Sequence, residues 1–254
     1  MTQPPTKQSV TDVVARAAAA LKRGRERHVA GAFSEAAAYF REASTLRESV
    51  FGAADARTLE AVRHEAAALA ALGQLESAAD LQFRALEGSV ESASRSRSRL
   101  ADDAAALARL RARQREWNDA ARLWLVVLRE RRATLGAHHP DTLNALAQLA
   151  NSWQSGEHPQ RAERAWRRLL AAREATGASA ADLAAVRERI ADCLAASDRR
   201  GEALAERLRA MSERSPAPAD ATRVPMPPAA TRDAAAKSSQ SAQPDASRDV
   251  SPKA

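Results

Sequence analysis

Small residues recur along this chain at a nearly constant spacing. Four alanines are separated by 42 residues each and a fifth comes one residue early: Ala36, Ala78, Ala120, Ala162 and Ala203. Twelve residues before each of them stands another small residue: Gly24, Ala66, Ala108, Ala150 and Ala191. Two helices that cross tightly need small side chains where their axes approach most closely. The pattern therefore predicts a row of helical hairpins, with a small residue on each helix at the crossing.

Larger apolar residues keep the same spacing. One position near the start of each second helix is shared by Phe33, Leu75 and Trp117. A position about two turns later is shared by Phe40, Trp124 and Trp166. Because these side chains recur at helical spacing inside a repeat, we predict that they fill the core and do not line a cofactor pocket.

The composition favours an all-α array over residues 11–214, where Ala, Arg, Leu and Glu dominate. Seven of the 11 prolines lie after residue 214, and residues 215–254 contain no Leu, Ile, Phe, Trp or Tyr. Such a segment cannot bury enough apolar surface to offset the entropy lost on ordering, so we expect a disordered tail. Residues 1–10, which include Pro4 and Pro5, are expected to be loose as well.

The repeat resembles a known family. Small residues at positions 8 and 20, an aromatic near position 24 and alanine or a similar apolar residue at position 27 form the pattern of tetratricopeptide repeats. The extra residues that lengthen the repeat to 42 are similar to the linker of kinesin-light-chain-type repeats, clearly in LGAHHPDTL (Leu135 to Leu143) and degenerately in FGAADARTL (Phe51 to Leu59). HEAT-like repeats have a similar period, but the paired small residues and the linker argue against them.

This resemblance implies a right-handed α-solenoid of about five helix-turn-helix repeats. Two positions depart from the family pattern, because position 24 is Gln82 or Arg207 in two repeats and position 7 is Arg23 or Glu65 in two repeats. The first two hairpins and the last are therefore degenerate copies.

The resemblance also implies where a partner would bind, because the first helix of each hairpin lines the concave groove of such an array. The positions that usually face this groove are basic in the early repeats, then amides, then acidic: Lys22, Arg25, Arg63, His64, Arg109, Arg113, Asn144, Gln148, Asn151, Glu188 and Asp192. We expect a non-enzymatic scaffold or adaptor that holds an extended, acidic segment of a protein partner. The alternative is that these arginines are ordinary solvent-exposed residues of the helices and bind no partner.

A specialised carboxylate clamp, as in chaperone-binding relatives, is not supported. Asn151 matches the ninth position of its repeat, but the fifth position is Ala147, and Arg189 stands where the clamp requires asparagine.

Two other functions compete with peptide binding. The formal net charge of +7 allows single-stranded RNA in a basic groove. RNA binding usually needs aromatic platforms for base stacking, and the groove positions offer little beyond His64, so nucleic acid ranks third. The second alternative is homotypic assembly, in which a weak terminal hairpin buries apolar residues against another copy.

Catalysis and metal binding find little support. The chain has no Gly-rich phosphate loop and no nucleophile elbow, and the neighbouring Asp102 and Asp103 point in different directions on a helix. His138 and His139 with Asp141 give too few ligands for zinc. We predict instead that the Asp141 carboxylate caps a helix N-terminus. No cofactor is expected.

The single cysteine, Cys193, lies among apolar helical positions and is predicted to be a buried, unreactive thiol. The first residues lack the pattern of a secretory signal, and no window holds the ~18 apolar residues of a membrane span. These features predict a cytoplasmic protein without a membrane anchor.

Overall fold

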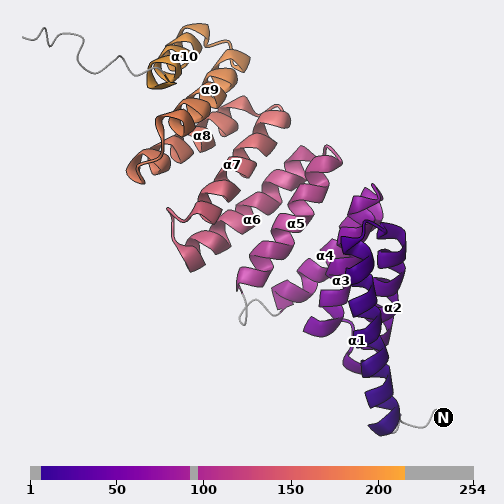
Figure 1. The fold of residues 1–254 in the computed structure, drawn as a ribbon. Helices are drawn as coiled ribbons and strands as arrows, with labels where there is room; N and C mark the ends of the chain where they lie inside the picture. The colour runs from indigo at the N-terminus through magenta and orange to yellow at the C-terminus, as the bar shows by residue number, and fades with distance from the viewer. Residues whose placement is uncertain (1–6, 92–96, 215–254) are drawn as a thin grey trace, which may run out of the picture. The chain divides into compact units, whose positions relative to one another are not determined.

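A computed structural model describes residues 7–91 and 97–214 of this chain. Over these residues it contains ten α-helices and no strand, as Figure 1 shows: α1 (Lys7–Val29), α2 (Phe33–Phe51), α3 (Ala56–Ala71), α4 (Leu75–Glu91), α5 (Arg97–Arg113), α6 (Trp117–Leu135), α7 (Pro140–Ser155), α8 (Pro159–Ala175), α9 (Ala180–Ala196) and α10 (Arg200–Arg214). Consecutive helices contact each other along the whole series. The prediction of an all-α array of five helical hairpins is confirmed.

The sequence period determines where the helices begin. The second helices of the five hairpins start at equivalent residues, which are Phe33, Leu75, Trp117, Pro159 and Arg200. The last interval is one residue shorter, as the early position of Ala203 indicates. A proline is tolerated at the first position of α8 because the N–H it lacks would have no partner inside the helix.

The predicted crossing points form the centre of the core. All ten small residues at these positions are buried. Gly24 is the extreme case, because a Cβ atom there would lie 2.6 Å from Cε1 of Phe40. Phe40, Trp124 and Trp166 are themselves buried, which confirms that the recurring aromatic residues pack the interior.

Each hairpin turns through a residue with left-handed backbone at the same point of the repeat. The φ angles are 77° at Gly31, 79° at Gly73, 64° at Arg115, 60° at Glu157 and 59° at Asp198. Glycine adopts this conformation without steric cost, whereas residues with a Cβ adopt it less readily. Three of the five turns are therefore strained by comparison with the first two.

The boundaries differ from the prediction at one end. Helix α1 begins at Lys7, before the predicted start of the array at residue 11, and α10 extends to Arg214, the last described residue. Residues 7–10 of the segment predicted to be loose therefore belong to α1. Residues 1–6 lie outside the described part of the chain. The predicted disordered tail, residues 215–254, also lies outside it.

The N-terminal cap of α7 is also different from the prediction. His139 occupies the cap position, and its Nδ1 accepts a hydrogen bond from the backbone N–H of Asp141 at 3.1 Å. The prediction that Asp141 is the cap was therefore wrong. Because Pro140 occupies the first helical position, the Asp141 N–H is the second in the helix, within reach of the side chain that precedes the proline.

Candidate functional site

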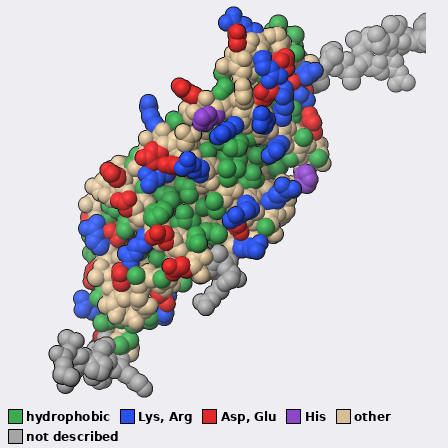
Figure 2. Space-filling view, turned by 180° about the vertical axis from the view of Figure 1, so that it is seen from behind, with side chains coloured by type: hydrophobic (Ala, Val, Ile, Leu, Met, Phe, Trp, Pro, Cys, Tyr) green, Lys and Arg blue, Asp and Glu red, His purple; other side chains and the backbone are tan. Residues whose placement is uncertain are grey.

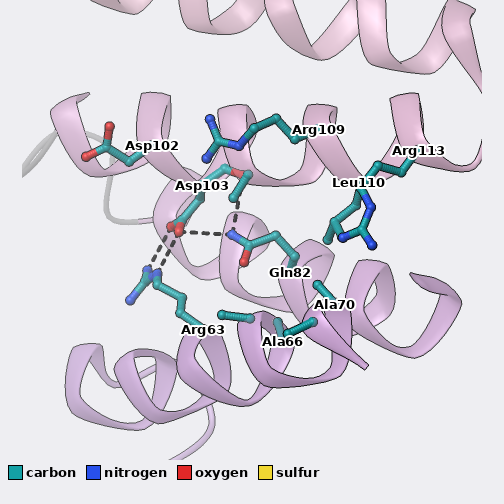
Figure 3. A pocket seen from close by; sticks show the side chains of 12 residues that line it. Arg63, Ala66, Ala70, Gln82, Asp102, Asp103, Arg109, Leu110 and Arg113 are labelled. Atoms are coloured by element: carbon teal, nitrogen blue, oxygen red, sulfur yellow. Dashed lines mark hydrogen bonds and ion pairs between the residues drawn. The ribbon is translucent and has the colours of Figure 1, made fainter. Parts of the chain in front are cut away.

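A cleft between α3 and α5 contains the largest group of predicted groove residues. Its volume is about 580 Å³, and it is lined mainly by residues of these two helices. On α3 the lining residues include Arg63, Ala66, Ala67, Ala70 and Ala71. On α5 they are Asp102, Asp103, Ala106, Arg109, Leu110 and Arg113, and Gln82 of α4 lies between the two helices (Figure 3). The first helices of the second and third hairpins thus form one surface.

The cleft combines a shallow apolar floor with basic side chains at its edge. Alanine side chains from both helices and Leu110 provide the floor. Such small side chains leave room for a peptide backbone to approach the helices. Arg109 and Arg113 lie one turn apart on α5 and are both exposed.

These two arginines are the cations of the cleft that are free to bind a partner. Within the described residues, neither makes an ion pair or a side-chain hydrogen bond with another side chain. Partial burial lowers the pKa of Arg109, and the nearby Arg131 lowers it further, whereas Asp102 opposes the shift. An anionic ligand would relieve both effects, because it would supply the missing counter-charge.

Arg63 lies in the same cleft but is already neutralised. Its guanidinium donates to both carboxylate oxygens of Asp103, with Nε–Oδ1 at 2.6 Å and Nη2–Oδ2 at 2.8 Å. Gln82 donates to Asp103 Oδ1 at 3.2 Å, and Ser89 donates to Asp103 Oδ2. The Asp103 side chain is 3% exposed and that of Arg63 is 21% exposed. The bidentate pair therefore ties α3 to α5 across the interface between two hairpins.

The basic residues of the first hairpin are also partly engaged. Arg25 Nη2 lies 2.6 Å from Glu60 Oε1 and 3.3 Å from His64 Nε2. The His64 ring stacks on Phe40, with the ring centroids 5.1 Å apart. Burial lowers the pKa of His64, and the charge of Arg25 adds to this effect. Lys22 is exposed.

The predicted amides continue the face of α5 onto α7. Asn144, Gln148 and Asn151 are one period after Asp102, Ala106 and Arg109. Asn144 is exposed, and Gln148 and Asn151 are half-buried. The further acidic positions, Glu188 and Asp192, lie on α9, where Glu188 pairs with Arg214 and Asp192 pairs with Arg207. The character of the predicted groove therefore changes from basic to amide to acidic along the chain.

Sequence reasoning missed a second cleft, which has a volume of about 400 Å³ and lies between α6, α7 and α8. Its α7 residues, Leu146, Leu149 and Trp153, lie on the opposite side of that helix from the amides, because successive residues turn by about 100°. Leu125 and Leu128 of α6 complete its apolar wall, and α8 supplies Arg161, Arg164 and Arg168.

A sequence signal for exposed apolar surface did exist. Phe83 and Leu125 are one period apart, and both are close to half exposed. Figure 2 shows that one face of the molecule carries a broad apolar area bordered by charged side chains. Exposed apolar surface on this array is therefore not restricted to the first helices of the hairpins.

The remaining candidate residues occupy structural positions. Cys193 is buried, and burial raises the pKa of its thiol to about 11, as expected for an unreactive cysteine. Asp103 is buried in its ion pair, and Asp102 points away from it into solvent (Figure 3). Among the described helices, none is long and apolar enough to cross a membrane.

Comparisons with known proteins agree with the helical architecture. Residues 104–141, which run from α5 to the start of α7, match the sequence model of the tetratricopeptide repeat. The chain carries a tetratricopeptide repeat array. No curated protein matches the sequence.

Solved structures show the same fold. The repeats of a kinesin light chain homologue from Podosopora anserina, described as putative and TPR-like, superpose with a TM-score of 0.66 at 20% identity, covering 78% of this chain and 95% of that one. BtubC (BKLC) from P. vanneervenii gives a TM-score of 0.60 at 17% identity, covering 98% and 100%. The MamA protein gives 0.57 at 11% identity, covering 78% and 91%. The tetratricopeptide array of this chain is thus similar in fold to kinesin-light-chain-type repeats, as its linkers predict.

Proposed function

We propose that this chain is a non-enzymatic, cytoplasmic scaffold that holds an extended acidic segment of a protein partner in the α3–α5 cleft. The observation that carries the proposal is the pair Arg109 and Arg113, which stands without a counter-ion beside an alanine floor. A tetratricopeptide array is a fold typical of protein–protein interaction. The unpaired arginines of the cleft favour an acidic partner segment over a neutral or basic one.

The proposed binding mode uses two kinds of contact. Carboxylates of the partner pair with Arg109 and Arg113, since hydrogen bonds between charged groups are stronger than those between neutral ones. The partner backbone lies over Ala67, Ala70 and Ala106, where small side chains allow a close approach. The amides of α7 can bond further backbone groups as the segment continues. Affinities of about 1 µM, or roughly −8 kcal/mol, are expected for such a contact.

RNA binding is less favoured by the same surface. The lining of the α3–α5 cleft includes no aromatic side chain. The nearest predicted platform, His64, already stacks on Phe40. Bases would therefore lack the stacking contacts that normally supply much of single-strand affinity.

Selection from a random peptide library displayed on phage tests the proposed preference for acidic segments. Selection on the full chain is expected to enrich peptides with acidic residues separated by small ones. Elution at high salt should recover them, because screening weakens contacts between exposed charges. Enrichment of neutral or basic peptides, or no enrichment, would contradict the proposal.

A further inference from the structure

The last helix, α10, has an apolar stripe that nothing in the described structure covers. Leu204, Leu208 and Met211 are 58%, 56% and 64% exposed. Their spacing of four and then three residues places them on one face of the helix. Gly201 and Ala205, which are also exposed, lie beside the stripe, and a Cβ atom at Gly201 would meet open space.

The other hairpins show what two of these positions normally do. The residues equivalent to Leu204 are all buried: Ala37, Ala79, Ala121 and Glu163. Those equivalent to Met211 are buried or half-buried: Ser44, Leu86, Leu128 and Leu170. In each of these hairpins the first helix of the next hairpin packs against the second helix. Leu204 and Met211 therefore belong to a stacking surface whose partner helix is missing among the described residues.

The segment that follows α10 is a poor substitute for that partner. Residues 215–254 contain no Leu, Ile, Phe, Trp or Tyr, and seven of their positions are proline. A covering helix would need a regular apolar face, which this composition does not supply.

The opposite end of the array is also unsuited to cover the stripe. In α3, Thr58, Glu65 and Leu69 are buried, and Glu65 pairs with Arg41 of the preceding hairpin. The equivalent residues of α1 are all arginines and all exposed: Arg16, Arg23 and Arg27. Stacking of copies head to tail would press these arginines against Leu204 and Met211, which is unfavourable because it buries charge.

We propose that α10 packs antiparallel against α10 of a second copy, so that each apolar stripe covers the other. The antiparallel arrangement places Leu204 of one copy near Met211 of the other, while Glu202 and Arg214 keep their partners Arg199 and Glu188 within each copy. Gly201 and Ala205 permit a close approach of the two helices. A two-fold contact uses the same surface on both copies, so it closes as a dimer and does not extend into a filament.

Sedimentation velocity of the full chain, over about 1 to 100 µM, tests this proposal. We expect a reversible dimer, with a dissociation constant of about 1–10 µM because a single-helix contact is small. The double variant Leu204→Glu/Met211→Glu should raise this constant at least tenfold and sediment as a monomer. A matched variant, Phe83→Glu/Leu125→Glu, makes the same chemical change at two other half-exposed sites and should leave the dimer intact. Circular dichroism establishes that both variants keep their helices.

Three other outcomes would contradict the proposal. If the following segment covered the stripe, the wild-type chain would be monomeric and deletion of residues 215–254 would produce the dimer. A wild-type monomer at about 100 µM, with or without those residues, would also overturn the proposal. So would a dimer that the change at Leu204 and Met211 does not weaken.

Discussion

At the scale of single residues, one buried carboxylate, Asp103, is the ion-pair partner of Arg63. Asp103 accepts hydrogen bonds from Arg63, Gln82 and Ser89 in an interface between two hairpins. Replacing it as Asp103→Asn would leave the Arg63 guanidinium mostly buried without a counter-charge. We expect the free energy of unfolding to fall by about 2–4 kcal/mol, measured by urea denaturation.

A double variant separates the ion pair from simple loss of packing. In Arg63→Met/Asp103→Leu both charges are absent, so no buried charge remains unpaired. We expect this variant to be more stable than Asp103→Asn, because well-packed apolar residues often replace a buried pair without loss. Equal or lower stability would show that the pair itself contributes most of the energy.

Sequence reasoning could place Arg63 but could not predict its partner. The repeat register assigns Arg63, Arg109 and Arg113 to the same face of the array, and the three residues line one cleft. Asp103 is 40 residues away in the chain, and its burial depends on how α4 and α5 pack. The 42-residue period does not predict this ion pair, because the pair occurs at one interface between hairpins and not in every repeat. For that reason a charge reversal at Arg63 would disturb the fold and is a poor probe of the groove.

His64 makes stability depend on pH in a defined direction. Burial lowers its pKa below the usual 6.5, and Arg25 and His28 lower it further, while Glu60 opposes them. A lowered pKa means that the unfolded chain binds a proton more readily than the folded one. The contribution of neutral His64 is therefore complete above pH 6.5 and is lost as the pH falls below it.

Urea denaturation at about pH 7.5 and about pH 5.5 tests this effect. Wild-type protein should lose more unfolding free energy over this range than His64→Gln, which keeps a polar group near Arg25. The other histidines are common to both proteins, and carboxylates titrate mainly at lower pH. Equal losses in the two proteins would mean that His64 is not the group responsible.

At the scale of elements, three hairpin turns have a residue other than glycine at the position with left-handed backbone. Arg115 adopts a left-handed backbone at the position that glycine occupies in the first two hairpins. Arg115→Gly should therefore raise stability by about 0.5–1 kcal/mol, because it removes the strain of a Cβ. The matched change Gly73→Ala should lower stability by about 1 kcal/mol in the same thermal denaturation assay. A loss of stability in both variants would contradict this interpretation of the turns.

The helix crossings are the second test at this scale. Ala120 is fully buried where α6 meets its partner helix. Ala120→Leu must force the helices apart, so we expect a loss of about 1–3 kcal/mol or more in thermal denaturation. Ala185→Leu places the same side chain at an exposed position of α9 and should cost little. An unchanged melting temperature in Ala120→Leu would remove the basis for the repeat alignment.

The elements were predictable to different degrees for a physical reason. Helix starts and crossing positions follow directly from the 42-residue period, since every hairpin must solve the same packing problem. The His139 cap has a counterpart two periods earlier, because Asp55 caps α3 through the N–H of Arg57 in the same way. Alignment of the two linkers could therefore have indicated the cap position, although the residue types differ. The apolar cleft beside Leu125 and Trp153 is not predictable from the period, because apolar residues that recur at helical spacing all look like core positions.

At the scale of the whole molecule, the two ends and the centre of the array have different chemistry. The outer side of α1 carries exposed arginines, and α10 carries an exposed apolar stripe. Between them, the first helices present a basic cleft and then amides. The terminal helices of the array and the cleft use separate residues. Self-association and partner binding can therefore be tested independently.

The measurement that tests the proposed function most directly is the affinity of the full chain for an acidic peptide obtained by selection. Fluorescence anisotropy compares wild-type protein with Arg109→Glu/Arg113→Glu and with Arg161→Glu/Arg164→Glu, which makes the same charge change at the cleft between α6 and α8. We predict at least a tenfold weaker affinity only for the first variant, with unchanged helicity in both. An unchanged affinity for that variant, or a larger loss from the change on α8, would contradict binding in the α3–α5 cleft.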